Sequence, residues 1–105
     1  ALAQTGAPVA PAALYGAMDD VVQAVREEAV QALVSLRSPG LTAVLQRRLA
    51  DAPPEGRVHA LRLAALSANP RLIRDIGPFL ADGDPEVRAY AAAAIVAIGA
   101  RAEAP

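Results

Sequence analysis

The chain of 105 residues contains no cysteine, no tryptophan and no lysine, and only 3% of its residues are aromatic. Without cysteine it forms no disulfide, offers no thiol for catalysis and builds no cysteine-based metal site. Its one histidine, His59, leaves no histidine pair to hold a metal. The net charge is −1, so no excess of either sign draws the chain to nucleic acid or acidic lipid. No apolar run approaches the roughly 20 residues that cross a bilayer.

What the chain has in abundance is small aliphatic residues. Hydrophobic residues make up 54% of it, and they are mainly alanine, leucine, valine and isoleucine. Such side chains let helices approach closely, which favours stacked helices over packed sheets. The nine prolines and seven glycines gather in clusters that mark boundaries between elements. The length fits one domain, and we expect that domain to be all-α.

Four residue types recur at a spacing of 31 positions, without gaps, in three copies. These columns are Pro8, Pro39 and Pro70; Asp20, Asp51 and Asp82; Arg26, Arg57 and Arg88; and Ala29, Ala60 and Ala91. Alanine content raises the number of chance matches, but it does not explain columns of proline, aspartate and arginine. The sequence therefore predicts three repeats, 8–38, 39–69 and 70–100, between an N-terminal extension, 1–7, and a C-terminal tail, 101–105.

Each repeat has the pattern of two antiparallel helices. Asn69-Pro70 and Asp84-Pro85 each join a capping residue to a proline at the first helical position. The pattern predicts first helices near 10–18, 40–50 and 70–81, and second helices near 22–37, 54–68 and 85–99. Gly77-Pro78 falls inside the last first helix and should bend or break it.

Apolar side chains at helical spacing identify the expected core. The first helices supply one column with Leu14, Leu45 and Ile76, and another with Met18, Leu49 and Leu80. The second helices supply two clear stripes, Val25, Ala29, Ala32, Leu33 and Leu36, and Val87, Ala91, Ala94, Ile95 and Ile98. We expect these side chains to be buried.

An aspartate precedes an arginine by six residues in every repeat, and residues 84–99 read DPEVRAYAAAAIVAIG. This segment resembles the second helix of bacterial HEAT repeats, notably the short form named after phycobilisome lyases, and the resemblance covers roughly residues 8–100. It implies an α-α superhelix, or solenoid, with second helices lining the concave face. It also implies a hydrogen-bonded ladder between adjacent repeats, formed by Asp20, Arg26, Asp51, Arg57, Asp82 and Arg88. Gly56 departs from the pattern, which expects valine.

Physical chemistry supports such a ladder. A turn aspartate caps the following helix, while the rigid arginine fork reaches a carboxylate in the next layer. We therefore expect Asp51→Ala to lower the melting temperature. The alternative, that these arginines bind a phosphate or carboxylate ligand, is the less favoured interpretation.

Nothing in the sequence indicates catalysis. No nucleophile-elbow motif surrounds Ser35, Ser38 or Ser67, and there is no glycine-rich phosphate loop. The paired carboxylates Asp19-Asp20 lie at an inter-helix turn, where capping explains them. We expect no enzyme activity, no cofactor and no metal.

The register also indicates where a partner would bind. Positions 28 and 31 of the first repeat, with their counterparts 31 and 62 residues on, lie on the open side of the second helices. The nominated partner-binding residues are Glu28, Gln31, His59, Arg62 and Tyr90. Tyrosine and arginine are favoured where interfaces concentrate their binding energy. The competing interpretation is ordinary exposed surface.

The resulting hypothesis is a protein–protein interaction or scaffold module that binds another protein on the concave surface of a short solenoid. The alternative is a structural or regulatory repeat segment of a larger multidomain protein with no ligand of its own. Residues 90–98 are apolar nearly all round, which suggests self-association or further repeats. We expect a cytoplasmic protein, because no export signal is visible. An outer basic patch for nucleic acid would consist of Arg47, Arg48, Arg71 and Arg74 on the first helices. The near-neutral charge, the absence of lysine and the scarcity of aromatic residues instead favour solvated helix surface and argue against a nucleic-acid partner.

Overall fold

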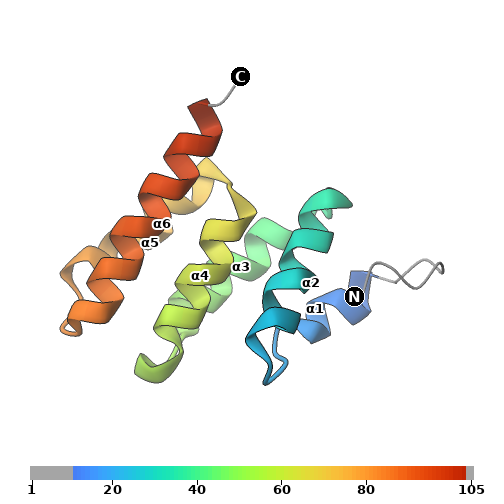
Figure 1. The fold of residues 1–105 in the computed structure, drawn as a ribbon, viewed down its shortest axis with the longest axis horizontal. Helices are drawn as coiled ribbons and strands as arrows, with labels where there is room; N and C mark the ends of the chain where they lie inside the picture. Colours follow the sequence, from blue (N-terminus) through green and yellow to red (C-terminus); the bar gives the residue numbers. More distant parts are fainter. Residues whose placement is uncertain (1–10, 104–105) are drawn as a thin grey trace. The chain divides into compact units, whose positions relative to one another are not determined.

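The computed structural model describes residues 11–103, and the regular secondary structure in this part of the chain is all helical. It contains six α-helices and three short 3-10 helices, with no strand among the residues described (Figure 1). The predicted all-α class and the six helices are thus confirmed. The N-terminal extension 1–7, Pro8 and the last two residues of the tail lie outside the described residues. The chain divides into two compact units, Ala1–Leu41 and Thr42–Pro105.

The first unit is built from α1 (Pro11–Ala17) and α2 (Gln23–Ser35), which pack against each other. Its buried apolar residues within these helices and the adjoining turn are Leu14, Met18, Ala29, Val30, Ala32 and Leu33. Five of the six match the predicted core, and Val30 is an addition. The alternation of small and branched side chains on α2 leaves room for α1 to approach closely.

Leu36 is a correction to the predicted core, because it is 57% exposed. The helix α2 ends at Ser35, and Arg37 adopts a left-handed conformation with φ of 52°. The Ser38 N–H donates to the Leu33 carbonyl oxygen at 3.1 Å, and the Arg37 N–H donates to that of Val34 at 3.0 Å. This pair of bonds closes the helix end as a Schellman motif does. Leu36 therefore lies in the closing turn, where the helical stripe no longer directs it inward.

The second unit holds the remaining helices. They are α3 (Leu41–Asp51), η1 (Pro54–Gly56), α4 (Arg57–Ser67), η2 (Pro70–Leu72), α5 (Ile73–Ile76), η3 (Gly77–Ala81) and α6 (Pro85–Glu103). In Figure 1, α4 and α6 lie side by side, and α5 and η3 also pack on α6. The Gln46 side chain on α3 donates to the Asp75 carboxylate at 3.2 Å, and the Asn69 amide donates to the Thr42 hydroxyl at 2.7 Å. These bonds connect α3 to the segment that contains α5.

The break at Gly77-Pro78 is confirmed, since α5 ends at Ile76 and the chain continues as the 3-10 helix η3. Pro78 lacks the N–H of an α-helical bond, and its ring crowds the preceding turn. The prediction that Leu80 is buried is wrong, because this side chain on the 3-10 helix is 46% exposed. Four residues rotate the chain by about 400° in an α-helix but by about 480° in a 3-10 helix. Leu80 is thereby turned away from the side that Ile76 buries.

The predicted caps fix the helix starts in the second unit. The Asn69 side chain accepts a bond from the Arg71 N–H at 3.0 Å, and the Asp84 carboxylate accepts one from the Glu86 N–H at 2.9 Å. Both caps precede a proline at the first helical position, as expected. The core between the helices is apolar throughout, with no buried polar or charged residue in the described range. Its members from Thr42 onward are Leu45, Leu49, Ala60, Leu61, Leu63, Ala64, Leu72, Ile76, Val87, Ala91, Ala94 and Ile98.

Candidate partner-binding site

Two of the nominated binding residues meet between α4 and α6. The guanidinium carbon of Arg62, on α4, lies 5.8 Å from the centroid of the Tyr90 ring, on α6. Both side chains are half-buried. This geometry is that of a cation–π contact, which stabilises by about 0.5–1 kcal/mol at such sites. Ala60 and Ala91 on the same two helices are buried, and small side chains of this kind allow helices to pack closely.

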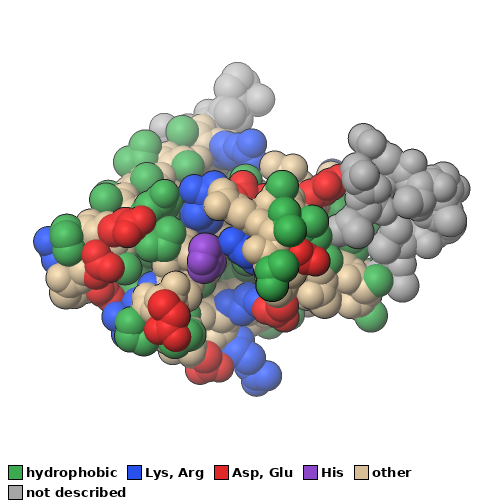
Figure 2. Space-filling model, turned by 60° about the horizontal axis from the view of Figure 1, so that its bottom comes forward, with side chains coloured by type: hydrophobic (Ala, Val, Ile, Leu, Met, Phe, Trp, Pro, Cys, Tyr) green, Lys and Arg blue, Asp and Glu red, His purple; other side chains and the backbone are tan. Residues whose placement is uncertain are grey.

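His59 belongs to the same side of α4, three residues before Arg62. Side chains at this spacing are neighbours on a helix surface. The histidine is exposed, and Figure 2 shows it in purple at the molecular surface. The second unit thus presents an aromatic ring, a guanidinium group and an imidazole from two adjacent helices. We call His59, Arg62 and Tyr90 the Arg–Tyr patch.

The other two nominated residues, Glu28 and Gln31, lie in the first unit. They stand one helical turn apart on α2, where Glu28 is half-buried and Gln31 is exposed. Neither belongs to the predicted stripe of buried residues on that helix. The alignment of Glu28 and Gln31 with the Arg–Tyr patch, which the 31-residue register implies, remains a prediction.

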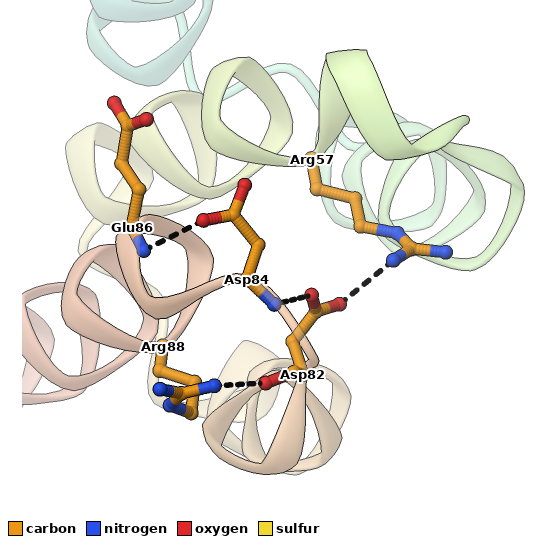
Figure 3. A network of polar contacts seen from close by, with 5 residues as sticks. All are labelled: Arg57, Asp82, Asp84, Glu86 and Arg88. Atoms are coloured by element: carbon orange, nitrogen blue, oxygen red, sulfur yellow. Dashed lines mark hydrogen bonds and ion pairs between the residues drawn. The ribbon is translucent and has the colours of Figure 1, made fainter.

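The aspartate and arginine columns form a polar network at the turn before α6 (Figure 3). The Arg57 Nη1 donates to Asp82 Oδ2 at 2.8 Å, and this ion pair is partly shielded, since the Asp82 side chain is only 10% exposed. Asp82 Oδ1 accepts a bond from the Asp84 N–H at 2.9 Å. The Asp82 carbonyl oxygen accepts a third, at 2.6 Å, from Nη1 of Arg88. One residue therefore ties α4, the turn and α6 together.

The turn before α2 repeats the local part of this network. Asp20 Oδ1 accepts a bond from the Val22 N–H at 2.8 Å, and the Asp20 carbonyl oxygen accepts one from Arg26 Nη1 at 2.8 Å. The six-residue spacing thus lets Arg26 and Arg88 reach back to the backbone of their own aspartates, Asp20 and Asp82. The resemblance to HEAT repeats implies pairing between adjacent repeats. It does not indicate this local bond from an arginine to the backbone of the preceding aspartate.

Asp51 differs from the other two members of its column. It is the last residue of α3 and is exposed. The residue two positions on is Pro53, which has no N–H to donate. Asp51 therefore lacks the donor that Asp20 and Asp82 both bond. Of the predicted ladder, the structure brings Arg57 and Asp82 together within the second unit, and the complete ladder remains a prediction.

Among residues 11–103, no group of three or more histidine, cysteine, aspartate and glutamate side chains is arranged to hold a metal ion. None of the helices in this range is both long and apolar enough to cross a membrane.

Comparison with known proteins gives no match, whether to protein-family models, curated sequences or solved structures.

Proposed function

We propose that the chain is a short HEAT-like solenoid of three helix-pair repeats and that it acts as a protein-binding or scaffold module. The observation that carries the proposal is the Arg–Tyr patch, in which Arg62 lies over the ring of Tyr90 between two packed helices. The 31-residue spacing of proline, aspartate, arginine and alanine supports the repeat architecture.

The chemistry of the patch suits protein recognition. Tyrosine and arginine supply large contact areas and several hydrogen-bond donors, and both are enriched among the residues that dominate interface energies. Because Arg62 and Tyr90 are half-buried and already stacked, a partner would immobilise less side-chain freedom on binding. Pre-organisation of this kind lowers the entropic cost of association.

The framework beneath the patch favours a rigid binding surface. Leu63, Ala64, Ala91 and Ala94 are buried in α4 and α6 beside the patch residues. Interiors of this kind are close-packed and hold side chains in fixed rotamers. A partner would therefore meet a preformed surface, and a scaffold role needs no large change of shape.

Affinity capture from a lysate of the source organism tests the proposal. The wild-type chain is compared with a variant that carries His59→Ala, Arg62→Glu and Tyr90→Ala. The matched control carries Arg47→Glu, Arg71→Ala and Arg74→Ala, which alters exposed arginines on α3, η2 and α5. All three proteins must keep the same helical circular-dichroism spectrum at the assay temperature.

A protein retained by the wild type and the control, and lost by the patch variant, would support the binding module. Equal capture by all three would overturn the assignment to the Arg–Tyr patch. Loss in the control alone would move the interface to the first helices. Absence of any specific partner would favour the alternative function, a structural segment of a larger protein.

A further inference from the structure

One side of α4 begins with the arginine that is paired to Asp82 and continues with buried apolar residues. Arg57, Leu61 and Ala64 follow one another at spacings of four and three residues, so they share one side of the helix. Arg57 is bonded to Asp82, which immediately precedes the turn into α6, and α4 packs on α6. Leu61 and Ala64 are both fully buried. This side of α4 is therefore an apolar strip that begins with Arg57. The arginine is paired with Asp82, which belongs to the following helix pair.

The same side recurs on α6, 31 residues later. Its members are Arg88, Ala92 and Ile95, with Val96 beside them. Here Ala92 is exposed, Ile95 is half-buried and Val96 is 69% exposed. Arg88 is also exposed and bonds the Asp82 carbonyl oxygen. We call these four residues the α6 strip. It repeats the pattern of arginine followed by aliphatic residues on α4, but here Ala92 and Val96 are exposed.

The counterpart that would complete the α6 strip is present at the other end of the sequence. Asp20 makes the same two hydrogen bonds as Asp82, with Oδ1 bonded to the N–H two residues on and its carbonyl oxygen bonded to the following arginine, Arg26. In Asp82 the remaining carboxylate oxygen, Oδ2, accepts the bond from Arg57. Among the described residues, no donor is bonded to Oδ2 of Asp20. Beside it, Val21 is 93% exposed, an apolar side chain facing solvent.

We propose that the α6 strip of one copy docks the turn and second helix of the first repeat of another copy, so that chains associate head to tail. Arg88 of one copy donates to Asp20 Oδ2 of the next, as Arg57 donates to Asp82 within the chain. The small side chains of the α6 strip allow close helix approach. A second copy fits as the partner because this chain itself carries both the exposed Arg88 of the α6 strip and the carboxylate oxygen of Asp20 to which no described donor is bonded. The contact is heterologous, so it either closes a ring or continues from copy to copy.

Sedimentation velocity over a wide range of concentrations tests the proposal with the full chain. The wild-type mass is expected to rise with concentration beyond that of a single chain. Val96→Glu places a charge in the α6 strip, and Ala92→Glu does so independently. Asp20→Asn keeps the Oδ1 acceptor of the cap but replaces Oδ2 with an N–H donor that opposes Arg88. Each of these variants alone is expected to remain monomeric.

Mixing the Val96→Glu and Asp20→Asn variants gives the decisive test. Val96→Glu retains an intact Asp20 turn, and Asp20→Asn retains an intact α6 strip, so an equimolar mixture is expected to form dimers and nothing larger. The matched controls are Ala43→Glu, an exposed alanine on α3, and Asp84→Asn, an aspartate-to-asparagine change at another cap. Both controls should associate as the wild type does.

Three results would overturn the proposal. The wild type could stay monomeric at every concentration. The Asp20→Asn variant could associate normally while Val96→Glu does not, which would indicate a symmetric contact between two α6 helices. The mixture could remain monomeric although each variant is folded. The test is separate from that of the proposed function, because the variant of the Arg–Tyr patch leaves both halves of this contact intact and should associate normally.

Discussion

The helices α4 and α6 pack against each other and carry matching positions 31 residues apart in the sequence, yet they differ in what they bury. Leu61 on α4 is fully buried, whereas Ala92, 31 residues later on α6, is exposed. Ala65 is half-buried, and its equivalent Val96 is largely exposed. The more apolar helix is thus the less covered one. Burial in such a chain depends on the neighbouring helix pair as well as on the helix's own sequence.

The difference also shows how the exposed side is tolerated. Where α4 has leucine at position 61 and position 66, α6 has alanine at 92 and 97. Exposing a methyl group costs much less than exposing a leucine side chain, because the hydrophobic free energy scales with apolar area at about 25 cal/mol per Å². Val96 is larger than an alanine and is still 69% exposed, so a surface that covered it would stabilise α6 more than one that covered Ala92 or Ala97.

The largest expected effect on stability is at Leu61, because α4 has leucine there and α6 has alanine 31 residues later. Leu61→Ala should lower the free energy of unfolding by about 2–5 kcal/mol, because it leaves a cavity in a fully packed site. The reciprocal change, Ala92→Leu, should alter it by no more than about 0.5 kcal/mol at low protein concentration. Urea denaturation of both variants measures the contrast. Similar losses from the two substitutions would contradict the difference in burial between α4 and α6.

The second effect concerns the ion pair that joins the two helices. Asp82→Ala should cost about 1–3 kcal/mol, because it removes both the cap on the Asp84 N–H and the partner of Arg57. Asp82→Asn keeps an acceptor for the cap and should cost less. Combining each change with Arg57→Gln in a double-mutant cycle isolates the pair from the cap. If Asp82→Asn were as damaging as Asp82→Ala, the cap would contribute nothing.

A smaller effect is expected at the aspartate that has no cap to make. Asp51→Ala should lower the stability by about 1 kcal/mol if Asp51 contributes to the predicted ladder. Because Pro53 offers no N–H, the loss would report the ladder alone, free of the capping effect that accompanies Asp20 and Asp82. Thermal unfolding followed by circular dichroism measures it. An unchanged melting temperature would remove Asp51 from the ladder.

Local signals in the sequence predict the helices well. Asn69-Pro70 and Asp84-Pro85 are capping pairs whose effect needs only a few neighbouring residues, and both caps form. The break at Gly77-Pro78 follows from the missing N–H of Pro78. The rotation of Leu80 out of the core was not predicted, because helical spacing assumes a constant 3.6 residues per turn and the 3-10 helix η3 does not keep it.

Contacts between helices are predicted less completely. A single stripe per helix does not include Val30 and Leu61, which are 31 residues apart and both fully buried. Amphipathic spacing identifies only one side of each helix, so it does not include residues that are buried on another side. For the candidate site, the register indicates that Arg62 and Tyr90 lie on the open sides of their helices. That the guanidinium lies over the ring depends on side-chain geometry between helices, which the sequence does not specify.

The smallest expected effect is the coupling between those two side chains. Arg62→Met and Tyr90→Leu keep much of the apolar volume while removing the charge and the ring, so their double-mutant cycle should give a coupling of about 0.5–1 kcal/mol. Tyr90→Phe retains the ring face and should keep most of the coupling, whereas His59→Ala should leave it unchanged. A coupling of zero would mean that Arg62 is not held by Tyr90. The pre-organisation on which the proposed binding surface depends would then be lost, although α4 and α6 would still pack through their alanines.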